Sequence, residues 1–387
     1  MNTKTPERQR EKNNVKRVSD AAKIPGRAYF LVLMVTVLLL VSCLIAFFVF
    51  LGKDAPDGNF YDQGYNGSVN VKPNGSGSSN QGSMSQGSSN NSSQGVDKSS
   101  TSRGGNLPGK TVSKRSSYIS KTASDVKYIS SQINSENVIL IDLDTYTSIA
   151  EKSADKRIYP ASMTKVMSLL VACENVKSLS TVLTVTEDVV EYASEMDGSG
   201  IGLKVGDRLT IQDLLYLTAY QSDTIAVTML ANYVGGSETG FVNLMNSKAR
   251  TLGLTNTRFA NPTGLHDENN YTTCREMAAI FAYALENPLC KELLTSYSAY
   301  KIGNQYTIYS TWYSGRFKDN PKLSTVTVSG GKTGDIDESG FCLVSYATGR
   351  SSGKKFIQVI VGQPKGSGLT ESISVSEIKY VYNNFAS

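Results

Sequence analysis

The sequence predicts an α+β domain over residues 117–387, and three observations point to it. Strand patterns open this region, a block of helical patterns follows, and an antiparallel run of strands with a closing helix ends it. This order favours a domain in which early and late strands share one sheet with helices packed against it. An apolar segment and a polar linker precede the domain, so the folded part is smaller than the chain of 387 residues.

The N-terminal region predicts a single membrane span. Residues 1–27 are polar and basic, and residues 28–51 are apolar without a charged side chain. That run is long enough to cross a hydrocarbon core of ~30 Å as a helix. A signal peptide has a shorter apolar core and a small-residue cleavage site, and no Ala-x-Ala pattern follows residue 51. Because the basic flank precedes the span, we expect the N-terminus in the cytoplasm and residues 117–387 on the other side of the membrane.

Residues 52–116 predict a disordered linker. The segment is rich in Gly, Ser, Asn and Gln and poor in large apolar residues. Such a composition buries too little surface to offset the entropy lost on ordering. A flexible coil of this length averages roughly 45 Å from end to end. We expect a tether that lets the outer domain work away from the membrane; an unselected spacer is the alternative.

The elements of the domain follow from periodicity and end signals. Val166 to Cys173 is apolar on nearly every side, which is typical of a helix in the middle of a domain. Thr210 and Asp213 form a capping-box pattern, and Gly253 is a helix stop. The expected helices are 118–133, a helix opening after Pro160, 211–219, 224–234, 238–252, 273–285 and 372–385. The expected strands are 137–142, 148–152, 180–186, 305–311, 324–329, 340–347 and 356–362.

Composition excludes several kinds of chemistry. His266 is the only histidine, which argues against a histidine zinc site and leaves lysine as the more probable base of a serine enzyme. No cysteine pair has metal or redox spacing, so buried thiols are expected, and a disulfide between two of them stays open. The net charge of +5 forms no basic stripe outside the N-terminal tail. We predict no metal, no cofactor and no nucleic-acid partner.

The main candidate for catalysis is the pair Ser162 and Lys165. On one helical face a lysine three residues after a serine can take the hydroxyl proton and create a nucleophile. Ser-x-x-Lys by itself is weak, because the same spacing recurs elsewhere in the chain, for example at Ser124, Ser298, Ser351, Ser352 and Ser376. None of those opens a buried helix, so context favours Ser162.

Two further motifs are weak alone and informative together. Ser222-Asp223-Thr224 lies between two helices, where an ordinary helix cap is the simpler reading. Lys332-Thr333-Gly334 follows a strand, where glycine neighbours leave room for a ligand and a plain turn is the alternative. Ser-x-x-Lys, Ser-x-Asn-like and Lys-Thr-Gly in this order are the signature of penicillin-recognising serine enzymes.

Over 117–387 the chain resembles the low-molecular-weight penicillin-binding proteins of the D-alanyl-D-alanine carboxypeptidase family. Beyond the three motifs, the similar runs are 159–167, 202–210, 261–266 with 271–273, and 329–334 with 340–344. The resemblance implies a β-lactamase/transpeptidase-like domain, with an antiparallel sheet flanked by helices and an all-helical subdomain. It also implies action on peptidoglycan stem peptides and inhibition by β-lactams.

The resemblance also implies residue roles. Ser162 would be the nucleophile and Lys165 the general base, with burial and the nearby Lys332 charge favouring a neutral amine. Ser222 would relay a proton to the leaving amine. The substrate-binding residues would be Lys332, Thr333, Gly334 and Thr224, and the backbone N–H groups of Ser162 and Asp335 would form the oxyanion hole.

One departure and two alternatives remain open at this point. Thr224 stands where the family usually has Asn, and threonine lacks the amide donor. A class A-like β-lactamase shares the motif order, but its Glu-x-x-Leu-Asn-like loop is missing between Thr224 and Lys332. A catalytically inactive wall-binding homologue is the other alternative, and the Thr224 substitution is its only support.

Overall fold

The computed structural model describes residues 109–129, 132–303, 306–311, 322–363 and 371–386. The predicted tail 1–27, the predicted span 28–51 and linker residues 52–108 lie outside the described residues. Within the described ranges, no helix is long and apolar enough to cross a bilayer. Residues 109–116 of the predicted linker are described, and they hydrogen-bond to the domain: the Thr111 N–H donates to Glu174 and the Lys114 N–H to Glu286.

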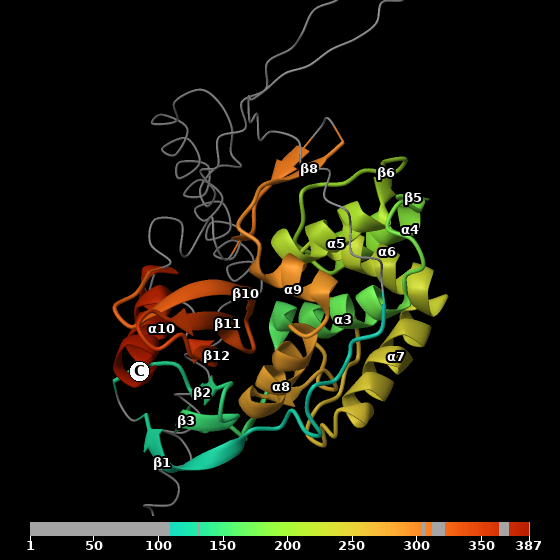
Figure 1. Ribbon diagram of the computed structural model, residues 1–387. Helices are drawn as coiled ribbons and strands as arrows, with labels where there is room; N and C mark the ends of the chain where they lie inside the picture. Colours follow the sequence, from blue (N-terminus) through green and yellow to red (C-terminus); the bar gives the residue numbers. More distant parts are fainter. Residues whose placement is uncertain (1–108, 130–131, 304–305, 312–321, 364–370, 387) are drawn as a thin grey trace, which may run out of the picture. The chain divides into compact units, whose positions relative to one another are not determined.

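A six-stranded sheet forms the centre of the described part of the chain, in the order β1-β3-β2-β12-β11-β10 (Figure 1). Its strands are β1 Lys121–Tyr128, β2 Asn137–Asp142, β3 Thr147–Lys152, β10 Val326–Ile336, β11 Gly340–Gly349 and β12 Lys355–Gln363. All neighbours pair antiparallel except β1 and β3, which are parallel. The early and late strands therefore share one sheet, as predicted, and the fold is the expected mixed α+β class.

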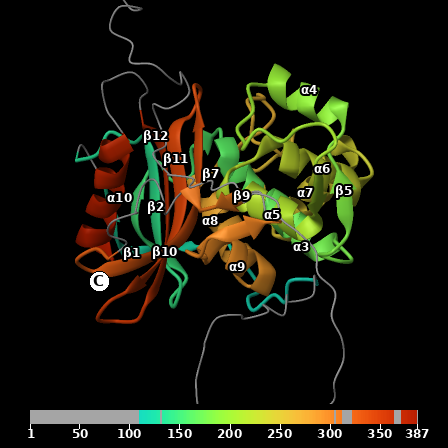
Figure 2. The same ribbon diagram turned by 90° about the horizontal axis from the view of Figure 1, so that it is seen from above.

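The helices lie mostly on one face of this sheet, and α10 covers the other (Figure 2). They are the 3₁₀ turn η1 Ala161–Thr164, α3 Lys165–Asn175, α4 Glu187–Glu195, α5 Ile211–Tyr220, α6 Thr224–Gly235, α7 Glu238–Thr251, α8 Cys274–Ala284, α9 Pro288–Thr295 and α10 Glu371–Phe385. The short strand pairs are β4 Arg157–Ile158 with β7 Thr272–Thr273, β5 Val182–Thr184 with β6 Arg208–Thr210, and β8 Tyr300–Ile302 with β9 Tyr306–Ile308.

Two apolar cores hold the layers together. The larger fills the space between the sheet and the helices, and α3 and α8 are its most deeply buried helices. The smaller packs α10 against the opposite sheet face. Because α3 is buried over residues 165–174, the side chains at its start are held in a fixed, water-poor setting.

Several predicted elements are confirmed. The strand 137–142 is β2, the Thr210/Asp213 capping box opens α5, and Thr273 caps α8. The four described cysteines are buried free thiols. The predicted helix 118–133 is wrong, because residues 121–128 within it form β1 at the sheet edge. Its side chains are mostly exposed, so pairing with β3 outweighs the local helical pattern.

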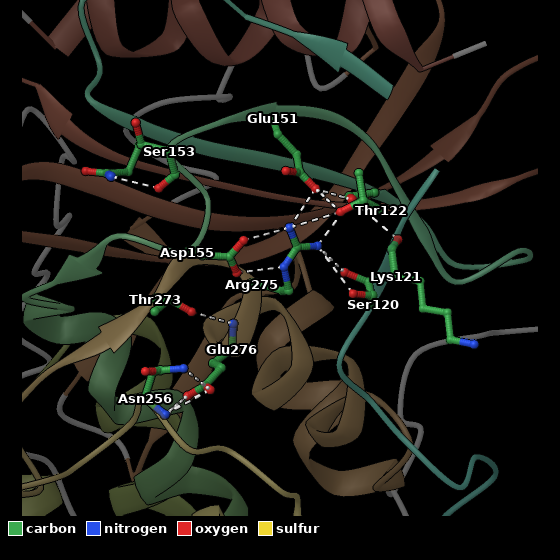
Figure 3. A network of polar contacts seen from close by, with 12 residues as sticks. Ser120, Lys121, Thr122, Glu151, Ser153, Asp155, Asn256, Thr273, Arg275 and Glu276 are labelled. Atoms are coloured by element: carbon green, nitrogen blue, oxygen red, sulfur yellow. Dashed lines mark hydrogen bonds and ion pairs between the residues drawn. The ribbon is translucent and has the colours of Figure 1, made fainter. Parts of the chain in front are cut away.

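A buried arginine ties α8 to the sheet (Figure 3). The Arg275 guanidinium donates to Glu151 at 2.7 Å and to both carboxylate oxygens of Asp155 at 2.8 and 3.0 Å. The same group reaches the Ser120 and Ser148 hydroxyls. The contacts join α8 to β3 and to the chain entering β1.

We expect Arg275→Ala to lower the free energy of unfolding by about 3–5 kcal/mol, because it leaves the Glu151 carboxylate buried without its cation. Urea unfolding measures this loss. Lys156→Ala is the matched control: its ion pair with Glu136 is well exposed, at 62% and 64% of the two side chains. Its expected effect is under about 1 kcal/mol. Equal losses in the two variants would contradict the argument.

Candidate active site

The predicted nucleophile and base come together at the start of the buried helix α3. Ser162 lies in the 3₁₀ turn η1, and Lys165 is the first residue of α3. Side chains three residues apart eclipse in a 3₁₀ turn, which aligns the pair more closely than the predicted α-helical turn. The Lys165 Nζ donates to Ser162 Oγ at 3.1 Å and to the Thr263 carbonyl at 2.6 Å.

Burial makes Lys165 a base near neutral pH. Only 1% of the residue is exposed, and desolvation lowers the pKa of its amine to about 7. Asp223 acts against this shift, because its negative charge favours the ammonium. The predicted effect of burial is therefore confirmed. The predicted effect of the Lys332 charge on this pKa stays a prediction.

The second motif faces the third. Ser222 joins α5 to α6, and its Oγ accepts a hydrogen bond of 3.0 Å from the Lys332 ammonium on β10. Lys332 is fully buried and also donates to the Thr333 carbonyl at 3.0 Å. The Ser222 backbone has a φ of 56°, a strained conformation for a residue other than glycine. Residues of the three sequence motifs thus form two lysine–serine hydrogen bonds, from Lys165 to Ser162 and from Lys332 to Ser222.

Asp223 holds the loop beside Ser222, a role that the sequence reading missed. Its carboxylate caps α6 by accepting from the Ala226 N–H at 2.9 Å, and it accepts from the Ile201 N–H at 3.0 Å. Burial raises the pKa of this carboxyl, and the N–H groups of Ala226 and Ile201, followed by the Lys165 charge, offset part of that rise. A helix cap is the simpler reading of this motif in the sequence, and the structure places that cap at Asp223 rather than at Ser222 or Thr224. The acidic residue between them was the available signal, since Asp is a preferred N-cap.

Thr224 is buried at the first position of α6, beside Asp223. Its side chain lies against Gly198, where even an added Cβ would approach it to 2.8 Å. Within the described part of the chain its hydroxyl has no hydrogen-bond partner. The Thr224 N–H donates to the Ser199 carbonyl, and the Ser199 hydroxyl donates to the Ser222 carbonyl, both at 2.8 Å. Its predicted contact with substrate stays a prediction.

Two glycines confine the turn that carries Ser162. Gly264 has a φ of 79°, and a Cβ there would lie 1.9 Å from the Ala161 carbonyl oxygen. Gly334, on β10, faces the same turn, with an added Cβ 3.0 Å from the Ala161 Cβ and 2.6 Å from the Cys342 sulfur. Asp335, the predicted oxyanion residue, follows Gly334 directly. The close approach of backbone segments therefore fixes Ser162 between β10 and the 261–265 turn.

We expect Gly264→Ala to destabilise the fold and to slow acylation of Ser162, because its Cβ would overlap a backbone oxygen. The expected loss is well above the ~1 kcal/mol of backbone strain alone. Gly353→Ala is the matched control, with a φ of 70° and open space around the added Cβ. Urea unfolding and the rate of penicillin adduct formation measure both effects. Similar losses in the two variants would refute the clash.

A buried lysine hydrogen-bonded to a serine at a helix start is the geometry that a serine enzyme with a lysine base requires. In the described residues, no cluster of side chains suited to hold a metal ion accompanies it. The sequence profile of the peptidase S11 family, D-alanyl-D-alanine carboxypeptidase, matches residues 121–365. The chain belongs to the D-alanyl-D-alanine carboxypeptidase family.

Curated relatives and solved structures agree with this assignment. The chain is 32% identical over 237 residues to D-alanyl-D-alanine carboxypeptidase DacF of Bacillus subtilis, covering 59% of this chain and 57% of the relative. It is 33% identical over 232 residues to DacC of Escherichia coli, covering 58% and 55%. The chain thus spans a little over half the length of these relatives. The Streptomyces K15 DD-transpeptidase structure aligns with a TM-score of 0.57 at 25% identity, covering 66% of this chain and 98% of that one.

Proposed function

We propose that the chain is a serine-type D-Ala-D-Ala carboxypeptidase that removes the terminal D-alanine from peptidoglycan stem peptides. The observation that carries the proposal is the hydrogen bond from the buried Lys165 amine to the Ser162 hydroxyl. An amine with a pKa near 7 is neutral in a large fraction of molecules at neutral pH, so it can accept the hydroxyl proton. The family and its named relatives support the substrate class.

Acylation follows from the positions of the side chains. Ser162 Oγ attacks the carbonyl carbon between the last two D-alanines, and its proton passes to Lys165. The N–H groups of Ser162 and Asp335 stabilise the negative oxygen of the tetrahedral intermediate. The C–N bond then breaks, and Ser222 relays a proton to the departing amine of D-alanine. Water hydrolyses the ester on Ser162 and releases the shortened peptide.

Substrate binding uses the third motif. The Lys332 ammonium and the Thr333 hydroxyl hold the terminal carboxylate, and Gly334 lets the peptide approach the strand. Thr224 would offer a substrate amide one hydroxyl in place of the two groups of an asparagine; this hydroxyl is buried and has no hydrogen-bond partner among the described residues. β-Lactams share the carboxylate and the reactive carbonyl of the dipeptide, so they would acylate the same serine.

The test combines two measurements on the full chain. The protein should release free D-alanine from a stem pentapeptide, and it should form a lasting adduct with fluorescent penicillin on the peptide that contains Ser162. Rapid turnover of penicillin without an adduct would favour a β-lactamase and contradict the proposal. Failure to act on any muropeptide would favour an inactive wall-binding homologue.

We also propose that residues 28–51 anchor the chain in a bacterial cell membrane with residues 1–27 in the cytoplasm. The support is the apolar run and the basic flank that precedes it. Protease added to intact protoplasts should remove the catalytic domain. Protection of that domain in intact protoplasts, with digestion after lysis, would refute this topology.

A further inference from the structure

We propose that the pocket at the end of β10 is a subsite for the third residue of the stem peptide, and that it selects a side chain ending in both an amino group and a carboxylate. The inference rests on the function proposed above and names the substrate class more closely. The pocket has a volume of about 310 Å³ and lies between the β10–β11 turn, the start of β2, the end of β12 and residues 156–159.

The order of groups along β10 fixes the direction in which the substrate lies. Lys332 and Thr333, which would hold the terminal carboxylate, come two to three residues before Asp335, whose N–H would bind the reacting carbonyl oxygen. The leaving D-alanine therefore lies over the earlier part of the strand. The acyl part of the peptide extends past Asp335 toward Ile336 and the β10–β11 turn.

Residues that line the pocket directly follow β10, at the positions that the third residue of the peptide would reach. An extended chain advances ~3.3 Å per residue, so a peptide along β10 moves about one strand position for each of its own residues. With the fourth residue of the stem beside Asp335, the third comes beside 336–337. Asp337 and Glu338 line the pocket, and so does Tyr159, three residues before Ser162.

The lining offers both signs of charge around an apolar floor. Ile158 and Val361 are the buried apolar residues of the lining. Around them, carboxylates come from Glu136, Asp337 and Glu338, and cations from Lys156 and Arg157. Glu136 and Lys156 pair with one another at 3.2 Å. A ligand with only an amine would match Glu338 but not Arg157, and one with only a carboxylate would match Arg157 but not Glu338. A side chain that carries both groups, as in a diamino dicarboxylic acid, complements the two sets.

Two rim residues are held in place by neighbours on the active-site side. The Arg157 guanidinium lies 3.7 Å from the centre of the Tyr271 ring. Glu338 Oε2 is 3.7 Å from His266 Nδ1. The His266 and Tyr159 rings pack edge to face, with ring centres 5.0 Å apart. Tyr159 and His266 therefore connect the pocket rim to the segment that carries the nucleophile. The Arg157 and Glu338 side chains, which would bind the third residue, are therefore oriented by these contacts before substrate binds.

The experiment compares three pentapeptides that differ only at the third residue: meso-diaminopimelic acid, L-lysine and L-norleucine. We expect kcat/KM for D-alanine release to fall in that order, by about fivefold at each step, the effect of losing one partly exposed charge interaction. Glu338→Gln should remove most of the advantage of lysine over norleucine. Arg157→Gln should remove most of the advantage of diaminopimelic acid over lysine.

Ratios between peptides keep the test independent of a general loss of activity. Glu195→Gln and Arg208→Gln, at exposed positions outside the pocket lining, are the matched controls and should leave the ratios unchanged. The rate of acylation by benzylpenicillin should be similar in all variants. Equal kcat/KM for the three peptides, or a preference for lysine over diaminopimelic acid, would overturn the subsite while the carboxypeptidase function stands. Absence of D-alanine release from every peptide would instead refute the function.

Discussion

Ser162→Ala is expected to abolish both D-alanine release and penicillin labelling while the protein stays folded. Without the hydroxyl no acyl-enzyme forms, and losing the nucleophile of a serine enzyme costs at least ~10³-fold in kcat. The side chain is small and only partly buried, so little packing is lost. D-Alanine release and mass spectrometry after incubation with penicillin measure the two outcomes, and circular dichroism checks the fold.

The sequence itself supplies the matched control for this variant. Ser351 and Lys354 repeat the Ser-x-x-Lys spacing, but they lie exposed in the turn between β11 and β12. Ser351→Ala should leave hydrolysis and labelling unchanged. Residual labelling of Ser162→Ala at another serine would show that Ser162 is not the nucleophile. Loss of activity in Ser351→Ala would show that a position at the start of a buried helix does not distinguish the two pairs.

Lys165→Met is expected to lower kcat/KM by about 10²–10⁴-fold, the usual contribution of a general base. In the wild-type protein the amine must be neutral to accept a proton, and its pKa is about 7. Wild-type kcat/KM should therefore rise about tenfold per pH unit up to roughly pH 7 and then level off. The variant should lack this rise. A wild-type profile that is flat between pH 5 and 8 would argue against Lys165 as the base.

The same substitution should change stability in a pH-dependent way. The pKa of Lys165 is about 7 in the folded state, and an unfolded lysine titrates near its ordinary value of 10.5. Between these values the unfolded chain binds more protons, so wild-type stability rises with pH over this window. The methionine variant lacks this titration. The Tm of the variant minus the Tm of the wild type should therefore be higher at pH 6 than at pH 9.5. A constant Tm difference would contradict the lowered pKa.

Much of the site could be predicted because its signals are local in the sequence. Ser162 and Lys165 open one helix, and the capping box of α5 occupies four consecutive positions, so both were found where the structure has them. The Thr263 carbonyl that orients Lys165 could not be found this way, since it lies 98 residues away and a backbone carbonyl carries no residue signature. Its run, 261–266, was recognised only through the family resemblance.

Other parts depended on tertiary packing. The segment 118–133 contains a plausible helical pattern, yet an edge position next to β3 makes it a strand. Helices α4 and α9 and strand β8 were not anticipated, because each is short and gains its stability from neighbours. Asp223 was placed in the right joint, and its contacts with Ile201 and with the charge of Lys165 follow only from the folded arrangement.

The two glycines around the nucleophile turn also limit how this protein can evolve. Any side chain at 264 would overlap the Ala161 carbonyl oxygen, and any at 334 would crowd the Cys342 sulfur. Under selection by a drug that acylates Ser162, no single substitution of either glycine can therefore alter the turn without disrupting it. Tolerated substitutions have to accumulate farther from the serine, so the innermost part of the site should drift more slowly than its rim.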